Sequence, residues 1–235
     1  MRVLRGLSVS VHEGEIVGLL GPSGAGKSTL FEVLAGEVPM HAGEVRLQGQ
    51  ALRREPLHVR ARLGLSYLPQ GPSVLHELSV RDNVRCFATL SGTPLREDAL
   101  LHMLERVGLS GRRDVRALDL SGGERRRLEI ARAILRKPAL LLADEPFAGM
   151  DPRAVADIAR LLRALAAEGL AILVSDHHAT EVLAIADRAL LLLDGALAAE
   201  APAGTFASHP AVSSRYFCDL APHALHPENA TRRDS

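Results

Sequence analysis

Apolar residues change their spacing along the chain, and each change marks the boundary of a predicted element. Leu7, Val9 and Val11 alternate with polar residues, which is the period of a half-buried strand. The run Ile16–Leu20 is continuously apolar, which is typical of a strand that is buried on both faces. A glycine-rich segment then leads into a helix, and two further short strands are predicted at 45–47 and 64–68.

From Ser79 to Lys137 the apolar spacing is helical. Ser79 marks one helix start, and Thr93 followed by a proline marks another, because proline is favoured at the first helical position. A third helix is predicted from Glu124 to Lys137, where a Lys-Pro pair ends it.

Beyond Pro138 strands and helices alternate again. We predict strands at 139–143 and 170–174, helices at 152–168 and 179–186, and a hairpin at 189–199. This alternation indicates an α/β protein with a mostly parallel sheet, an antiparallel β portion and an inserted α-helical subdomain. We place the domain at 1–217, with its core at 1–71 and 138–217, the helical subdomain at 72–137 and a flexible tail at 218–235.

Composition narrows the possible functions. Twenty-eight basic residues balance twenty-eight acidic residues, so charge gives no argument for a nucleic-acid partner. The two cysteines, Cys86 and Cys218, match no metal or disulfide spacing, which suits a reducing cytosol. Apolar runs are far shorter than the roughly twenty residues of a membrane helix. The start of the chain does not resemble a signal peptide, and we expect a cytosolic globular protein.

The segment "GPSGAGKS" fits the phosphate-loop pattern G-x-x-x-x-G-K-[ST], with a strand before it and a helix after it. Its backbone N–H groups would surround phosphates, Lys27 would reach the outer phosphates, and the Ser28 hydroxyl would bind Mg²⁺. The sequence therefore predicts a nucleoside triphosphate site. Its cofactor-binding residues are Gly21, Pro22, Ser23, Gly24, Ala25, Gly26, Lys27, Ser28 and Thr29.

Two adjacent carboxylates follow the apolar strand "LLLA". Asp144 is placed to hold Mg²⁺, and Glu145 is placed to accept a proton from the attacking water. Gln70 follows another strand, at the sheet edge where α/β proteins bind ligands, and its amide oxygen could touch the metal or the water. His177 also follows a strand, but the neighbouring His178 leaves the choice between the two histidines open.

The stretch "LSGGE" begins a helix with two glycines. Ser121 and Glu124 form a capping box, so Gly122 and Gly123 occupy the first two helical positions. Bare N–H groups at the positive end of a helix dipole make a seat for an anion. The alternative is an ordinary capped helix start with incidental glycines.

Together these motifs resemble the ATP-binding domain of ABC transporters. The phosphate loop, Gln70, "LSGGE", "LLLADE", the D-loop "AGMD" that ends at Asp151, and His177 occur in the order typical of that family. The resemblance implies a P-loop NTPase (RecA-like) core that uses ATP and Mg²⁺. It also implies that Glu145, His177 and Gln70 are catalytic, that Ser28, Gln70 and Asp144 bind the metal, and that Asp151 contacts nucleotide.

In that family two subunits pair head to tail. The resemblance implies a homodimer in which Ser121, Gly122 and Gly123 of one subunit bind the γ-phosphate held by the other. It also implies integral membrane permease subunits that contact a groove near Gln70 to Val84. We expect apolar residues of that stretch to be exposed for this contact: Val74, Leu75 and Leu78.

Within the family, "DEPFAGMDP" and "LSGGERRRLEIARAI" are most similar to the ATP-binding subunits of lipopolysaccharide exporters. Such a subunit would be cytoplasmic and peripheral on the inner membrane. The alternatives are an ATPase subunit of another transporter, such as a branched-chain amino-acid importer, and a soluble ABC ATPase that acts outside transport. Family members carry an upstream aromatic residue that stacks on adenine, but no aromatic residue precedes Phe31. Either the true start lies upstream or adenine is held in another way.

Overall fold

The computed structural model describes residues 3–215, so the predicted tail at 218–235 lies outside the described residues. Six strands form the main sheet in the order β4-β5-β6-β1-β7-β8. Neighbours are parallel except for the antiparallel β7–β8 hairpin, which confirms the predicted fold class. The bounds are β1 Ile16–Leu20, β4 Leu65–Leu68, β5 Leu140–Asp144, β6 Ala171–Ser175, β7 Arg188–Leu193 and β8 Ala196–Pro202.

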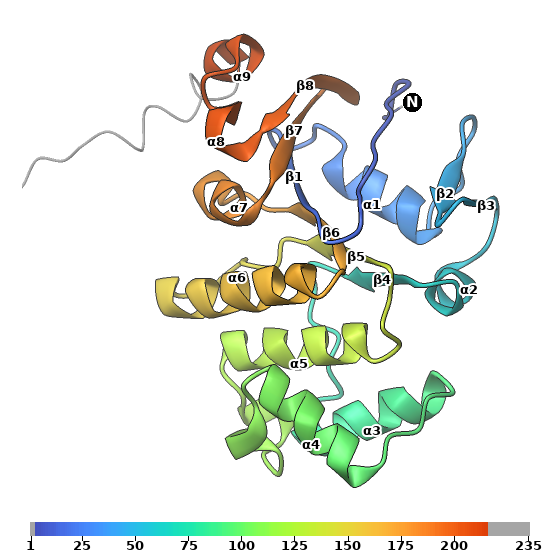
Figure 1. Ribbon diagram of the computed structural model, residues 1–235, viewed down its shortest axis with the longest axis vertical. Helices are drawn as coiled ribbons and strands as arrows, with labels where there is room; N and C mark the ends of the chain where they lie inside the picture. Colours follow the sequence, from blue (N-terminus) through green and yellow to red (C-terminus); the bar gives the residue numbers. More distant parts are fainter. Residues whose placement is uncertain (1–2, 216–235) are drawn as a thin grey trace, which may run out of the picture.

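Helices cover both faces of this sheet (Figure 1). Within residues 3–215, no helix combines the length and the apolar character needed to span a bilayer. The α-helices are α1 Lys27–Ala35, α2 Leu57–Arg62, α3 Val80–Leu90, α4 Glu97–Arg106, α5 Gly122–Ile134, α6 Pro152–Ala167, α7 Ala179–Ile185, α8 Ala203–Phe206 and α9 Pro210–Arg215.

The continuous apolar run of β1 supplies two cores, because successive residues of a strand point to opposite faces. Ile16 and Leu20 join a core that also contains buried residues of α5, α6 and α7. Val17 and Leu19 join a second core with the apolar side of α1. The sheet therefore separates α1 from α5, α6 and α7.

Three helices of the predicted helical stretch form a layer of their own. Figure 1 shows α3, α4 and α5 stacked beyond α6, with α5 nearest to the sheet. Helix α5 packs against α6 and β4, so this layer is attached to the β4 edge of the sheet. Short 3₁₀ turns at Ser110–Arg112 and Ala117–Asp119 connect α4 to α5.

The prediction of a strand at residues 7–11 is wrong. Leu7, Val9 and Val11 are half-buried and alternate with exposed residues, as the pattern predicted, but the segment is paired with no strand among the described residues. It cannot join the main sheet beside β1, because both edges of β1 are already paired, with β6 and β7. Its apolar side chains instead pack against the α1 core.

A second, two-stranded sheet contains one strand that the sequence pattern missed. Strand β2 Val45–Leu47 was predicted, whereas β3 Gln50–Leu52 was not. Gln48 and Gly49 connect them with φ values of 50° and 80°. Positive φ at both central residues is the geometry of a tight type I′ hairpin turn.

Gly18 provides a test of how α7 is seated on the sheet. A Cβ atom at this position would lie 2.6 Å from Val182 Cγ1. Gly18→Val should therefore lower the free energy of unfolding by about 1–3 kcal/mol, because α7 must move away from β1. Urea denaturation measures this change.

Gly204→Ala is the matched control, because a Cβ at Gly204 would meet no atom within 4 Å. Its free energy of unfolding should stay within about 0.5 kcal/mol of the parent value. Equal stability of Gly18→Val and the parent protein would show that α7 does not rest on this glycine.

Candidate functional site

The phosphate-loop residues form a tight turn between β1 and α1. Gly24 and Gly26 have φ values of 79° and 104°, which an L side chain rarely adopts. The loop curls around Lys27, whose Nζ donates hydrogen bonds to the carbonyls of Gly21 at 2.7 Å and Pro22 at 3.0 Å. Ser28, in the first turn of α1, is exposed at the loop. The loop thus presents backbone N–H groups, one ammonium and one hydroxyl together.

The two carboxylates lie at the end of β5, close enough to Lys27 to interact with its charge. Burial, together with the neighbouring Glu145 carboxylate, raises the pKa of Asp144 to about 6. Lys27 opposes this shift. Burial in turn lowers the pKa of Lys27, against the attraction of Glu145 and Asp144. Two acids therefore face one base, which leaves excess negative charge in a buried place.

The C-terminal ends of β4, β5 and β6 bring three predicted catalytic side chains together. Gln70 Nε2 donates a hydrogen bond to Glu145 Oε2 at 2.6 Å. His177 Nε2 lies 2.7 Å from Glu145 Oε1. His178 instead contacts Asp176, with 2.7 Å between Nδ1 and Oδ1, and this hydrogen bond raises the pKa of His178. The structure therefore assigns the contact with Glu145 to His177 and not to His178, a choice that the sequence left open.

Glu145 has a left-handed backbone, with φ of 46°. Its carbonyl accepts a hydrogen bond from Arg126 at 2.8 Å, and the same guanidinium donates to the carbonyls of Asp144, Pro146 and Pro69. Arg126 is a residue of α5 that the sequence analysis did not single out. It holds the ends of β4 and β5 against the helical layer.

Arg126 is paired with Glu129, one turn along α5, and both side chains are about 5% exposed. The second carboxylate oxygen of Glu129 accepts the N–H of Ser73 at 2.6 Å. Arg132, a further turn along, donates to the carbonyl of Ser73 at 2.7 Å. The charged row on α5 therefore also fixes the loop that follows Gln70. Its signal in the sequence is the i, i+3 spacing of opposite charges on a helix face.

The "LSGGE" stretch begins α5 with the predicted capping box. The Ser121 hydroxyl accepts the N–H of Glu124, and the Glu124 carboxylate accepts the N–H of Ser121. A Cβ at Gly122 would meet nothing within 4 Å, whereas one at Gly123 would lie 2.8 Å from Ala154 Cβ. Gly122 thus leaves the helix end open, and Gly123 allows α6 to pack closely.

Asp151 begins α6, where its side chain accepts the N–H groups of Arg153 and Ala154, both at 3.0 Å. Helices α5 and α6, which begin at the "LSGGE" stretch and at Asp151, belong to the core on the other side of the sheet from α1. Within one copy of the chain, these residues are therefore not brought together with the phosphate loop, in contrast to Gln70, Glu145 and His177.

The expected exposed apolar loop is only partly confirmed. Leu75 is 38% exposed, Leu78 is half-buried, and Val74 is buried at 8%. The expectation for Val74 is wrong because its side chain joins the core of the helical layer with Val80 and Val84. Asn83 holds the loop in this shape by accepting the N–H of Leu75 and donating to its carbonyl.

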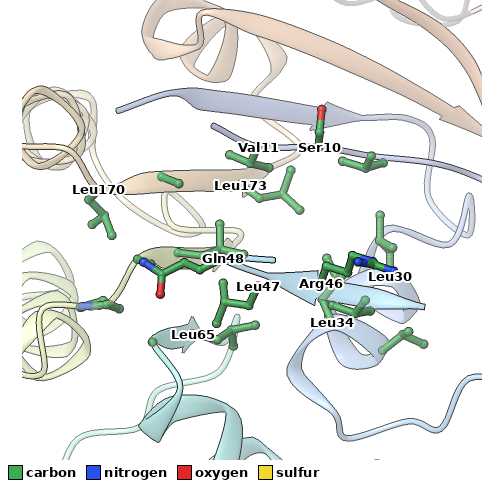
Figure 2. Close-up of a pocket in the computed structure, with 18 of the residues that line it drawn as sticks. Ser10, Val11, Leu30, Leu34, Arg46, Leu47, Gln48, Leu65, Leu170 and Leu173 are labelled. Carbon is green, nitrogen blue, oxygen red and sulfur yellow. The ribbon is translucent and has the colours of Figure 1, made fainter. Parts of the chain in front are cut away.

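A cavity of about 2700 Å³ reaches only Thr29 among the phosphate-loop residues 21–29. Figure 2 shows Leu30, Leu47, Leu65 and Leu173 around it, with the extended segment at Ser10–Val11 on one side. It is lined by none of Lys27, Gln70, Glu145 and His177. The charged and polar groups at the ends of β4, β5 and β6 therefore define the candidate site, rather than this cavity.

Comparison with known proteins adds independent information. The family model described as ABC transporter matches residues 4–148. The lipopolysaccharide export system ATP-binding protein LptB of Acidithiobacillus ferridurans is 44% identical over 221 residues, which cover 92% of this chain and 91% of that protein. The protein of the same name from Escherichia coli K12 is 44% identical over 201 residues, which cover 84% of this chain and 83% of that protein. The ADP conformation of an ATP-binding cassette of an ABC transporter matches with a TM-score of 0.83 at 28% identity, over 92% of each chain.

The raised pKa of Asp144 predicts a pH-dependent cost in stability. Because its pKa is about 6 in the folded protein and near 3.8 otherwise, the ionised carboxylate disfavours folding above pH 6. This cost fades as the pH falls through 6 and is absent below about pH 4. Asp144→Asn should therefore raise the free energy of unfolding by about 1–3 kcal/mol at pH 7.5 and leave it unchanged below pH 4.

Urea denaturation of the nucleotide-free protein at several pH values measures this difference. Asp98→Asn is the matched control, because its side chain is 75% exposed on α4. It should change stability by less than about 0.5 kcal/mol at every pH. An equal gain for Asp144→Asn at pH 4 and pH 7.5 would contradict the assigned cause.

Proposed function

We propose that this chain, which belongs to the ABC transporter family, powers lipopolysaccharide export by hydrolysing ATP between two copies of itself. It is the ATP-hydrolysing subunit of a transporter, as the ATP-binding proteins of this family are. The observation that carries the proposal is the position of Glu145, whose two carboxylate oxygens are engaged by Gln70 and His177 beside the phosphate loop.

ATP binding follows from the loop geometry. The backbone N–H groups of Gly24, Ala25, Gly26 and Lys27 would surround the phosphates at the positive end of the α1 dipole. The Lys27 ammonium, now held by two loop carbonyls, binds the outer phosphates.

The residues at the loop also fit Mg²⁺, which prefers hard oxygen ligands. Asp144 is a buried side chain whose carboxylate oxygens accept no hydrogen bond from the described residues, and burial and the neighbouring Glu145 raise its pKa. Ser28, Asp144 and the amide oxygen of Gln70 would hold the ion. When bound, Mg²⁺ neutralises charge that develops on the phosphates.

Hydrolysis requires a base and a group that orients it. Glu145 accepts the proton of the attacking water, because it is a carboxylate close enough to Lys27 of the phosphate loop for their charges to interact. His177 and Gln70 hold the two carboxylate oxygens in place and so fix the direction in which Glu145 receives the proton. Pairing of the two copies head to tail adds Ser121 and the open helix end at Gly122 to the phosphates of the other copy.

Mixing two inactive variants tests whether the site is shared between copies. Ser121→Arg blocks the helix end and Lys27→Ala removes the phosphate ligand, so each homodimer should lose about 100-fold or more in ATPase rate. In a mixed dimer one site carries both changes and the other carries neither, so activity should return in part. A coupled ATPase assay on the mixture measures the recovery.

Heterodimer formation is confirmed separately, with two affinity tags and sequential purification. Failure to recover activity in proven heterodimers would exclude the shared site while leaving ATP binding by the phosphate loop intact.

The lipopolysaccharide assignment rests on the 44% identity to two named export proteins. We propose that the chain lies on the cytoplasmic face of the inner membrane, where permease subunits contact the groove near Gln70 to Val84. Leu75 is the exposed apolar residue of that loop, and α5 fixes the loop through Ser73. A membrane partner that moves this loop therefore acts on Gln70 as well.

Leu75→Glu should abolish the proposed contact between this loop and the membrane subunits. The ATPase rate of the isolated subunit should stay within about twofold of the parent, because surface substitutions away from a site are close to neutral. Co-purification with membrane subunits should be lost, because a buried carboxylate in an apolar contact is unfavourable. In its own bacterium, depleted of the parent protein, the variant should fail to restore lipopolysaccharide at the cell surface.

Leu90→Glu is the matched control, since Leu90 is 76% exposed at the end of α3 and outside this loop. It should restore export. Normal assembly of Leu75→Glu with the membrane subunits would place the contact elsewhere. If depletion of the protein left surface lipopolysaccharide unchanged but abolished uptake of branched-chain amino acids, lipopolysaccharide would not be the substrate and the importer alternative would take its place.

A further inference from the structure

The backbone at Glu145 has to be held in a conformation that an L residue disfavours. Its φ of 46° lies in the left-handed region, and such residues persist only where surrounding contacts fix them. Pro146 has no N–H, so the turn from Glu145 to Phe147 offers two N–H groups. The Glu145 N–H is bound by the carbonyl of Ser175 at 2.7 Å, and the Phe147 N–H is bound by Asp176 Oδ2 at 2.9 Å. Two consecutive residues at the end of β6 therefore hold both sides of the turn.

The other oxygen of Asp176 shapes the neighbouring loop. Asp176 Oδ1 accepts the N–H of His178 at 3.0 Å, which is the contact of an Asx turn, and it also lies 2.7 Å from His178 Nδ1. This turn contains His177, whose Nε2 is 2.7 Å from Glu145 Oε1. The Asp176 side chain is 1% exposed, so water does not compete for these bonds.

We propose that Asp176 is a positioning residue for ATP hydrolysis: one carboxylate oxygen fixes the turn that carries Glu145, and the other fixes the turn that carries His177. This inference rests on the proposed role of Glu145 as the base. Asp176 touches neither the phosphate loop nor α1 in its hydrogen bonds, so it acts on the chemical step rather than on nucleotide binding.

The test is the effect of Asp176→Ala on kcat and KM for ATP. We expect kcat to fall about 10- to 100-fold, as for a small misplacement of reacting groups, and KM to change by less than about threefold. Asp187→Ala is the matched control, because Asp187 Oδ2 also holds a backbone N–H, that of Ile16, at the opposite end of β1. It should lower stability and leave kcat close to the parent value.

A double-mutant comparison separates positioning from general damage. If Asp176 acts through both turns, the loss caused by Asp176→Ala should be smaller when His177 is already Ala, because only its bond to the Phe147 N–H beside Glu145 then remains to be lost. The same loss in both backgrounds, or a change in KM alone, would overturn the inference. Asp176→Asn keeps the size of the side chain and one acceptor oxygen but cannot accept both N–H groups, so it should cost about two- to fivefold in kcat and provides the test if Asp176→Ala does not fold. In that case a kcat of Asp176→Asn equal to that of the parent overturns the inference.

Glu145→Gln distinguishes failure of the proposed base from failure of the positioning role of Asp176. If it hydrolyses ATP at the parent rate, the proposed base is wrong and the role of Asp176 falls with it. If Glu145→Gln is inactive while Asp176→Ala keeps the parent kcat, Asp176 alone is reassigned.

Discussion

Arg126 joins the parts of this protein that carry its chemistry. Its buried guanidinium donates to four carbonyls, at the ends of β4 and β5, and is paired with Glu129. Breaking a buried ion pair by removing one partner costs about 3–5 kcal/mol, because the other charge is left uncompensated. The helical layer and the sheet edge that carries the candidate site are therefore held as one unit. Movement of α5 reaches Glu145 and the Gln70 loop through these bonds.

The electrostatics of the site follow from the same crowding. Lys27, Asp144 and Glu145 occupy one buried region, and the two acids outnumber the base. Burial penalises each charge, so Asp144 holds its proton to about pH 6. A cation beside Asp144 would relieve this excess of negative charge, which is why the donor set suits Mg²⁺ and the phosphate loop suits the anion that accompanies it.

The two glycines of "LSGGE" serve different purposes. Gly122 faces open space, so the helix end stays accessible to an anion. Gly123 lies against Ala154, and a side chain there would push α6 away from α5. Gly123 is therefore not incidental, since helix packing requires it, whereas the open end at Gly122 is what the proposed anion site needs. Only the neighbour across the helix interface distinguishes them.

The sequence by itself determined the strands and helices that carry the motifs, because apolar periodicity and caps act over a few residues. It also identified the phosphate loop, the Asp144–Glu145 pair, Gln70 and the capping box of Ser121. Tertiary structure decided the contacts between residues that are distant in the sequence, which apolar periodicity does not encode. The segment at residues 7–11 has the pattern of a strand, yet both edges of β1 were already taken. Arg126 binds backbone carbonyls that lie 18 to 57 residues away, and no side-chain pattern marks a carbonyl acceptor. His177 and His178 are adjacent in sequence, and only the packing of β5 beside β6 brings Glu145 to His177, whereas His178 binds Asp176 two residues before it.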